Sequence, residues 1–332
     1  MIAHNRPSLG ELEAAVAAKI VQSCLVATGS ETKKFEDELC EFFGLPKGHC
    51  VVVSSGSAAL YLALIALRVK DKRIGVPVYS CASLRNAVSL IDGIPVYIDI
   101  ENGGPNLDIF AAATKELDFL IAPSMFGIPF EVPKERSYQV IEDISQCFGA
   151  KIGGIPIGNR GEIGICSFYA TKMITTGGHG GVIFSKNIQL IDIIRDYLDF
   201  DYRSDNLARF NFKITDLQSA IGRIQLQRLD SFIASRKLIF EKYESYGLSL
   251  MKGNLPGVFY RAIITTKDPA KMIEDLANLG ISSIVPINDW ELLDKSIRYP
   301  NALSLSSETV SLPIYPTLSM DIVAAIGSLL SV

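Results

Sequence analysis

Short apolar runs rich in β-branched residues alternate with longer segments of helical spacing through the first part of the chain. The strand-like runs are VVVSS (51–55), RIGVPVY (73–79), IPVYIDI (94–100), FLIAPS (119–124), QVIEDI (139–144), GICSFYA (164–170) and GGVIFS (180–185). Buried strands that alternate with helices favour a largely parallel sheet covered on both faces. We therefore expect an α/β fold for this region.

Helix signals mark the N-terminal segment. Ser8 and Glu11 have the spacing of a capping box, and Leu12 begins an apolar face that follows it. A second helix is predicted over residues 31–43, ended by Gly44. Two helices are therefore expected before the first strand.

Beyond residue 190 the pattern changes. Thr215 is placed to cap a long helix that ends near Gly247 and would connect two domains. After it come a strand-like run at 258–266, a helix near 270–279, the run SSIVPI at 282–287 and a final helix after Thr317. This is the pattern of a small α+β unit. We expect a large domain over residues 1–230 and a small C-terminal domain over residues 231–332.

Length and charge agree with this picture. At 332 residues the chain exceeds the usual size of one domain. Charged residues make up 20% of the chain and hydrophobic residues 48%, and the net charge is only −4. Such a protein carries no strong electric field, so we expect no nucleic-acid partner.

The cysteines, the histidines and the apolar runs indicate which sites and which cellular compartment to expect. The six cysteines form no CxxC pair and the three histidines are spread along the chain, so we expect neither a disulfide framework nor a metal site. The longest apolar run, AALYLALIAL at 58–67, indicates a buried helix, because it is far shorter than the ~20 residues that span a bilayer. Residues 1–14 lack the apolar core of a signal peptide. We expect a cytoplasmic protein with no membrane partner.

Lys172 stands in an unusual stretch, SFYATKMITTGGHGG at 167–181. An apolar run precedes it, a cluster of glycines follows, and no charged residue is adjacent. Most lysines are solvated surface groups, but a surface loop rarely has this composition. A Schiff base needs an amine that can lose its proton, and a lysine crowded by other groups does so readily. Lys172 is therefore a candidate for a Schiff base.

Two further groups follow predicted strands, where ligands bind in a parallel α/β sheet. SSGSAAL at 54–60 predicts a strand, a tight turn at Gly56 and a helix whose free N–H groups favour a phosphate; Ser57 could cap that helix and donate its hydroxyl. Asp143 ends the run QVIEDI, whereas Glu142 should point to the other side of the strand. Each signal alone has an ordinary interpretation, since serine, glycine and aspartate begin many helices. An amine, a carboxylate and a Ser-Gly turn together are the groups that pyridoxal 5'-phosphate (PLP) requires.

The order of the motifs is more specific than any one of them. GSAAL, PVYSCASLRNAV, IPVYIDI, IEDISQCFGA, SFYATKMITTGGHGG and FNFKITDLQSAIG follow one another in this chain. In this order the chain resembles the DegT/DnrJ/EryC1/StrS family of PLP-dependent sugar aminotransferases over residues 5–230, and again at SLPIYP, 311–316. The resemblance implies the aminotransferase fold of type I, with a mostly parallel central sheet flanked by helices. It also implies a homodimer with active sites shared between the subunits.

The resemblance assigns roles to residues by their position in the motifs. Lys172 matches the lysine that forms the internal aldimine and later shuttles protons, and Asp143 matches the partner of the pyridine nitrogen. Gln146 matches the side chain near the phenolic oxygen of the cofactor. The phosphate-binding residues implied are Gly56, Ser57, Ala58, Ser167 and, from the neighbouring subunit, Asn211.

Three features depart from the family pattern. Cys81 stands where many relatives carry an aromatic residue stacked on the cofactor ring, so it is either a small buried side chain or a ring contact. His179 stands where relatives usually carry a glutamate, and it is either a loop residue or a group that contacts the substrate. The C-terminal domain is shorter than usual in the family. Substrate identity is therefore what the sequence determines least.

The resemblance implies transfer of an amino group from an amino acid, glutamate in the family, to a keto group on a nucleotide-linked sugar. Surface polysaccharide and antibiotic sugar synthesis both use such a reaction. Related dehydratases have histidine in place of Lys172, which argues against dehydration. The alternative is a non-catalytic PLP-fold sensor or regulatory protein, suggested by Cys81, His179 and the short C-terminal domain. A nicotinamide dehydrogenase is disfavoured because no GxGxxG follows a strand.

Overall fold

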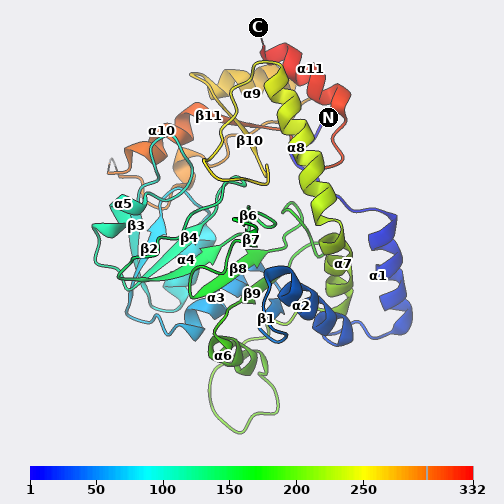
Figure 1. The fold of residues 1–332 in the computed structure, drawn as a ribbon, viewed down its shortest axis with the longest axis vertical. Helices are drawn as coiled ribbons and strands as arrows, with labels where there is room; N and C mark the ends of the chain where they lie inside the picture. The colour runs from blue at the N-terminus through cyan, green and yellow to red at the C-terminus, as the bar shows by residue number, and fades with distance from the viewer. Residues whose placement is uncertain (297, 332) are drawn as a thin grey trace.

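A seven-stranded sheet forms the centre of the structure, a computed structural model that describes residues 1–296 and 298–331 (Figure 1). The strand order is β1-β9-β8-β5-β4-β2-β3. The strands are β1 Cys50–Val53, β2 Arg73–Pro77, β3 Ile94–Ile98, β4 Phe119–Pro123, β5 Gln139–Asp143, β8 Ile163–Ser167 and β9 Gly181–Phe184. β9 is antiparallel to both of its neighbours, and the pairs from β8 to β3 are parallel. The expected mostly parallel sheet is confirmed.

Helices cover both faces of the sheet, because successive side chains of a strand point to opposite sides. Val51 of β1 packs in the core cluster on one side, and the next residue, Val52, packs in the cluster on the other. The helices on the Val51 side are α3 Gly56–Ala66, α4 Ala82–Leu90 and α6 Ile188–Leu198, and the Val52 side is covered by α2 Ser30–Phe43. The apolar run predicted as a buried helix is α3.

The first helix, α1 (Glu11–Ser23), begins later than predicted, with Gly10 as its N-cap. The capping box expected at Ser8 is therefore wrong. The Gly10 N–H donates to Glu13 Oε2 at 2.9 Å, and the other Glu13 oxygen accepts from Gln225 and Arg228. These contacts with a helix distant in sequence bury Glu13 and decide where α1 starts.

The helix predicted from Thr215 to Gly247 is two helices, α7 (Asp216–Gln227) and α8 (Leu229–Ser245). Thr215 caps α7 as predicted, since its hydroxyl accepts from the Gln218 N–H at 3.2 Å. Arg228 interrupts the helix with φ −94° and ψ −3° while its guanidinium donates to Glu13. The column formed by α7 and α8 still connects the sheet region with the upper part of the molecule (Figure 1).

The upper part has its own apolar cluster, built by the end of α8 and the elements that follow it. These elements are β10 Ala262–Thr265, α9 Pro269–Asn278, β11 Thr309–Leu312 and α11 Met320–Leu330. The 3-10 helix η1 Asp289–Glu291 and α10 Pro300–Glu308 also follow α8, but α10 packs against the main core. The run SSIVPI is not a strand; only Ile284 forms an isolated bridge, to Ser311. A short helix, α5 Ile109–Ala113, and the hairpin β6 Lys151–Ile152 and β7 Ile155–Pro156 complete the described elements.

The domain boundary near residue 230 remains a prediction. α8 contributes Phe232 to the cluster beside the sheet and Ile239 to the upper cluster. The N-terminal Ile2 bridges to Ile281 of the upper part, and α10 packs Ala302 against the main core. The predicted end of the small domain, residue 332, lies outside the described residues.

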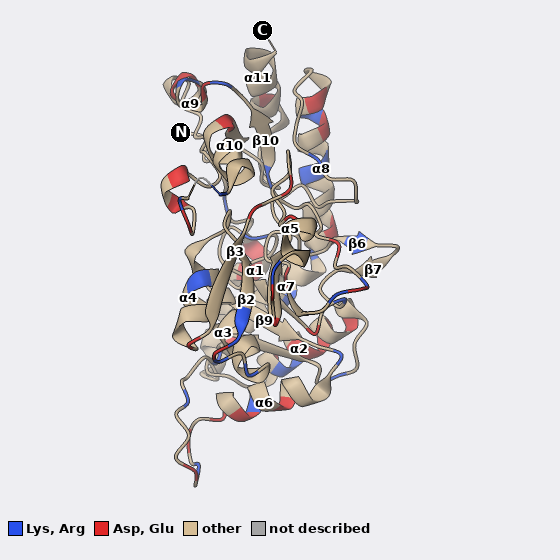
Figure 2. Cartoon of the chain, turned by 90° about the vertical axis from the view of Figure 1, so that its left-hand side faces the viewer, with Lys and Arg blue, Asp and Glu red and all other residues tan. Residues whose placement is uncertain are grey.

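A long loop without regular structure, residues 199–215, leaves α6 and extends from the body of the molecule (Figures 1 and 2). Arg209 pairs with Asp196 at 2.9 Å and with Asp205 at 2.6 Å, so ion pairs brace the loop. Elsewhere basic and acidic residues are interspersed along the chain (Figure 2). In the part of the chain that the structure describes, no helix has the length and apolar character needed to cross a membrane.

Candidate active site

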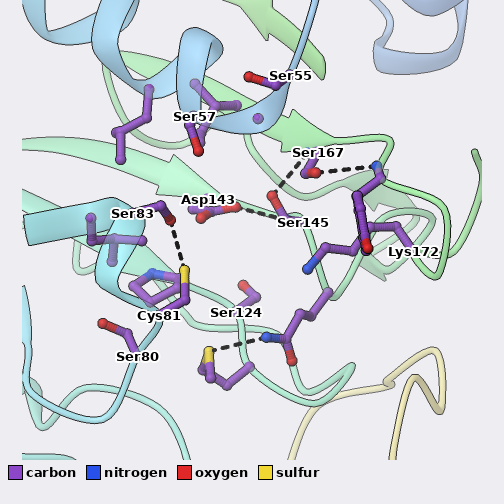
Figure 3. Close-up of a pocket in the computed structure, with 18 of the residues that line it drawn as sticks. Ser55, Ser57, Ser80, Cys81, Ser83, Ser124, Asp143, Ser145, Ser167 and Lys172 are labelled. Carbon is purple, nitrogen blue, oxygen red and sulfur yellow. Dashed lines mark hydrogen bonds between the residues drawn. The ribbon is translucent and has the colours of Figure 1, made fainter. Parts of the chain in front are cut away.

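A cavity with a volume of ≈ 300 Å³ opens at the carboxyl ends of the strands (Figure 3). Its walls come from the segments that follow β1, β2, β4 and β5 and from the end of β8, together with the loop that carries Lys172. The topology thus brings together strand ends that are far apart in the sequence, as expected for a parallel α/β sheet. Within residues 1–296 and 298–331, no group of three or more His, Cys, Asp or Glu side chains is arranged to hold a metal ion.

The turn after β1 leads into the N-terminus of α3 at the cavity wall. The N-cap is Ser55, whose hydroxyl accepts from the Ala58 N–H at 3.1 Å, so the prediction that Ser57 caps this helix is wrong. Ser57 lies instead in the first turn and lines the cavity, with its hydroxyl exposed there. The N–H groups of Gly56 and Ser57 precede the first possible intrahelical bond, so they remain free for a ligand. Ala58 is buried behind them, with its N–H bound to the cap.

Gly56 and Ser167 approach closely across the cavity wall. A Cβ atom on Gly56 would lie 2.5 Å from Ser167 Cβ and 3.1 Å from Ser167 Cα, closer than two such atoms can pack. Gly181 of β9 makes a similar approach, since its Cβ would lie 2.6 Å from the Ser55 carbonyl oxygen. Glycine at both positions lets the turn rest directly on β8 and β9, which brings Ser57 and Ser167 to one end of the cavity.

Asp143 ends β5 and lines the cavity, whereas its neighbour Glu142 points to the opposite side of the strand, as predicted. Asp143 Oδ1 accepts from the Ser145 N–H at 2.9 Å, and the Ser145 hydroxyl in turn accepts from the Ser167 N–H at 2.8 Å (Figure 3). Glu142 accepts three N–H bonds from residues 158–161, and burial raises the pKa of its carboxyl despite them. Asp143 is thus the carboxylate available to a ligand.

Lys172 extends its side chain into the cavity (Figure 3). Its backbone is held from two directions: its N–H donates to the Tyr169 carbonyl at 2.9 Å, and Asn5 donates to the carbonyl of Thr171 at 3.1 Å. Its Nζ lies 5.5 Å from the ring centroid of Tyr260, a residue that sequence patterns did not indicate.

Tyr260 is 4% exposed and surrounded by cations. Burial by itself raises the pKa of its phenol, but Lys172, Arg261 and Arg236 outweigh that effect and lower the pKa below its ordinary value. Tyr260 comes from the segment before β10, far along the chain from Lys172. No local signal in the sequence could have linked the two residues.

The remaining residues expected around the cofactor ring also line the cavity. Gln146 Oε1 accepts from the Phe126 N–H at 3.0 Å, which holds the amide beside the loop after β4. Cys81 is exposed on the wall with its sulfur 2.7 Å from Ser83 Oγ, so the interpretation as a small buried side chain is wrong. His179 is exposed at the cavity, with its ring centroid 5.2 Å from that of Tyr169.

Two predicted site residues, Ala58 and Asn211, do not line the cavity; Ala58 lies buried behind its wall, whereas Asn211 lies away from it. Asn211 is exposed on the loop 199–215, and its side chain accepts from the Lys213 N–H at 3.1 Å. Conversely, sequence reasoning missed Ser124 and Ser145, which line the cavity. Ser124 directly follows β4, so the same rule of strand ends that indicated Asp143 could have found it.

Chemically, the cavity offers an anion site, a carboxylate and an amine. Free N–H groups at a helix N-terminus with two hydroxyls suit a phosphate group. The Asp143 carboxylate can hold the proton of a ring nitrogen, and the Lys172 amine can attack a carbonyl carbon. These three groups fit a phosphorylated heteroaromatic aldehyde such as PLP.

Comparison with known proteins supports this interpretation. The model of the DegT/DnrJ/EryC1/StrS aminotransferase family matches residues 7–331. GDP-perosamine synthase of Escherichia coli O157:H7 is 26% identical and covers 91% of each chain. UDP-N-acetyl-3-dehydro-alpha-D-glucosamine 3-aminotransferase of Acidithiobacillus ferrooxidans is 23% identical over 99% of this chain and 95% of its own. The PLP-form of Spr1654 from Streptococcus pneumoniae has the same fold, with a TM-score of 0.88 and 20% identity over 99% of this chain and 98% of the other.

Proposed function

We propose that this chain, which belongs to the DegT/DnrJ/EryC1/StrS aminotransferase family, uses PLP to move an amino group from an amino acid to a nucleotide-linked keto sugar. The observation that carries the proposal is the meeting of Lys172, Asp143 and the first turn of α3 in one cavity. The name of the relative that aminates a UDP-linked dehydro sugar supports the substrate class. We propose glutamate as the donor, as the family resemblance implies.

Within the proposed site each residue has a defined task. The N–H groups of Gly56 and Ser57, with the hydroxyls of Ser57 and Ser167, hold the cofactor phosphate. Asp143, oriented by its bond from the Ser145 N–H, keeps the ring nitrogen protonated. When bound, PLP would supply the electron sink that removal of the donor's α-proton requires.

Lys172 has two tasks in the same reaction. Its Nζ would hold the cofactor aldehyde between turnovers, and as a free amine it would take the α-proton of the donor and return a proton to the sugar carbon. Gln146 lines the same cavity, and its amide would contact the oxygen substituent of the ring, as the family resemblance implies. Cys81 covers the ring face, and His179, beside Tyr169, contacts the substrate.

A second copy of the chain completes the proposed site through Asn211. This residue stands on an exposed loop and does not line the cavity of its own chain, which supports a contact with the phosphate of a neighbouring subunit. The loop and α1 also expose large apolar side chains: Phe210 is 65% exposed, Leu207 69% and Leu12 59%. A partner subunit that covers them removes this apolar surface from water.

The non-catalytic sensor is not favoured. It was suggested by Cys81, His179 and a short C-terminal domain, but both residues lie in a cavity that keeps the amine, the carboxylate and the phosphate turn together. The two readings differ in a direct test. A sensor would bind PLP but would not transfer an amino group from an amino acid to a sugar.

The experiment has two stages. Protein reconstituted with PLP should absorb in the visible range, and borohydride reduction should attach the cofactor to Lys172, as located by mass spectrometry. Glutamate should then bleach the band, and one member of a panel of keto sugar nucleotides should restore it. Lys172→Ala should give no attachment, while Lys151→Ala, at an exposed lysine of the β6–β7 hairpin, should behave as the wild type. Absence of attachment at Lys172 in the wild type would refute the PLP assignment, and bleaching without recovery would refute the keto-sugar acceptor.

A further inference from the structure

Tyr260 presents its ring face to the active-site amine from behind the cavity wall. Lys172 Nζ lies 5.5 Å from the ring centroid, within the ≈ 6 Å over which a cation is attracted to an aromatic face. Two further cations flank the ring, with Arg236 Cζ at 5.7 Å and Arg261 Cζ at 5.5 Å. Because Tyr260 is buried, this attraction acts away from water, where it is strongest.

Hydrogen bonds to other segments fix the backbone on both sides of Tyr260. The Val258 N–H donates to the Gly127 carbonyl at 2.9 Å, and the Arg261 N–H donates to the Phe126 carbonyl at 3.2 Å. The buried Arg236 of α8 donates to the carbonyl of Tyr260 itself at 3.2 Å. Bonds on both sides and at the residue leave the ring little freedom to move away from Lys172.

The backbone of the same two segments is strained, which favours a functional role for the position of Tyr260. Phe126 has φ 60° and Phe259 has φ 55°, a left-handed conformation that bulky residues rarely adopt. Gly127 also has a positive φ, and a Cβ there would lie 2.6 Å from the Tyr260 nitrogen. Such conformations persist only where surrounding contacts impose them, and they concentrate at functional sites.

A lysine that alternates between a bonded and a free state needs a defined place for its free amine. A carboxylate there would hold the ammonium tightly and keep its proton, whereas a ring face attracts the ammonium more weakly and leaves the proton free to depart. The groups that act on the Tyr260 phenol are the cations Lys172, Arg261 and Arg236 and the hydroxyl of Thr171. The charged groups that act on this phenol are therefore all cations.

We propose that the face of the Tyr260 ring is the docking place of the Lys172 amine whenever that amine is not bonded to the cofactor. Tyr260 is a positioning residue: it keeps Nζ within reach of the carbon that it must attack or protonate. The inference rests on the proposed function, because only a lysine that forms and breaks a bond during turnover needs such a place.

The test separates binding of the cofactor from closure of the bond to Lys172. Apoprotein is mixed with PLP in a stopped-flow instrument, where a concentration-dependent binding phase precedes a concentration-independent covalent phase in visible absorbance. Tyr260→Leu removes the ring and should slow the covalent phase about tenfold, the equivalent of a desolvated cation–π contact. Tyr260→Phe keeps the ring face and should stay within about twofold of the wild type. The binding phase should be unchanged in both.

Turnover provides a second readout. Tyr260→Leu should lower kcat for amino transfer by a similar factor and leave KM for the donor unchanged, because the ring acts on the freed amine and not on the substrate. Tyr243→Leu is the matched control: this buried tyrosine of the same region donates to the Pro313 carbonyl at 2.9 Å and lies outside the cavity wall. It should alter thermal stability but not the covalent phase.

Several outcomes overturn the proposal. A wild-type covalent rate in Tyr260→Leu would show that the ring does not position the amine, and equal slowing in the Leu and Phe variants would show that the hydroxyl acts instead. If Tyr260→Leu does not fold, phenylalanines with increasing numbers of fluorine atoms at position 260 keep the shape while weakening the ring face; rates that do not fall along this series also overturn it. Failure of the wild type to bind PLP at all would instead refute the proposed function.

Discussion

Gly56→Ala tests the geometry on which the proposed phosphate site depends. The new Cβ would lie 2.5 Å from Ser167 Cβ and 3.0 Å from its Oγ. Carbon atoms pack at ~3.5–4.0 Å, so the two segments must separate by about 1 Å. Ser167 cannot yield easily, because β8 is paired with β5 on one side and with β9 on the other. The N-terminus of α3 should therefore move.

The displacement has two measurable costs. Overpacking of this kind destabilises a fold by about 1–3 kcal/mol. A hydrogen bond of ~2.9 Å from a first-turn N–H to the phosphate would lengthen to about 3.9 Å and be lost. Bonds to charged groups contribute about 1.5–3 kcal/mol each, so loss of one should raise the Kd for PLP roughly tenfold to a hundredfold.

Urea unfolding of the apoprotein and spectroscopic titration with PLP measure the two costs separately. Gly178→Ala is the matched control. Gly178 lies in the glycine cluster that follows Lys172, but a Cβ atom there would meet no atom within 4 Å. It should change stability by less than about 0.5 kcal/mol and leave the Kd unchanged. Wild-type stability in Gly56→Ala would refute the close approach, and lost stability with an unchanged Kd would refute the phosphate assignment.

Three further predictions concern other parts of the site. Asn211→Ala should raise the Kd for PLP about tenfold if the residue reaches the partner's phosphate, and mixed dimers with Lys172→Ala should regain activity; an unchanged Kd contradicts the shared site. Of the two exposed thiols, bound PLP should protect Cys81 from alkylation about tenfold or more while leaving Cys24 reactive, as followed by mass spectrometry; equal labelling contradicts the ring contact. Burial and Arg261 lower the pKa of His4 from 6.5 to about 3, so between these values the unfolded chain binds a proton that the folded chain does not. Stability should therefore fall as pH falls from 6.5, by at most ~1.4 kcal/mol per pH unit, and His4→Gln should lose this dependence in urea unfolding; the same slope in the variant contradicts it.

Features that depend on neighbours in the sequence were predicted well. Gly44 ends α2 with a positive φ of 66°, and Thr215 caps α7 through its own hydroxyl. The seven strands of the sheet all fall within the predicted apolar runs except for Cys50 of β1 and Ile163 of β8, each one residue before its run. Asp143 and the turn at Gly56 could be placed at the cavity because parallel strands end at one edge of a sheet.

Predictions failed where a distant contact competes with a local signal. The capping box at Ser8 is locally reasonable, yet Glu13 is drawn toward Gln225 and Arg228, and α1 begins at Glu11. The residue that donates to Glu13, Arg228, is also the residue at which α7 ends and α8 begins. Ser57 is a possible cap by residue type, but Ser55, two residues earlier, has the extended backbone, φ −165°, that a cap requires.

By itself the sequence determined the order of the seven strands of the central sheet along the chain, the candidate amine and carboxylate, and the family, because each follows from local periodicity or from ordered motifs. Only the tertiary structure decided which groups surround Lys172. Tyr260 reaches it through the loop after β4 and through α8, and Asn5 through the N-terminal segment. These contacts join parts of the chain with no common local pattern, because packing and backbone hydrogen bonds between distant segments depend on the folded geometry and leave no periodic signal in sequence.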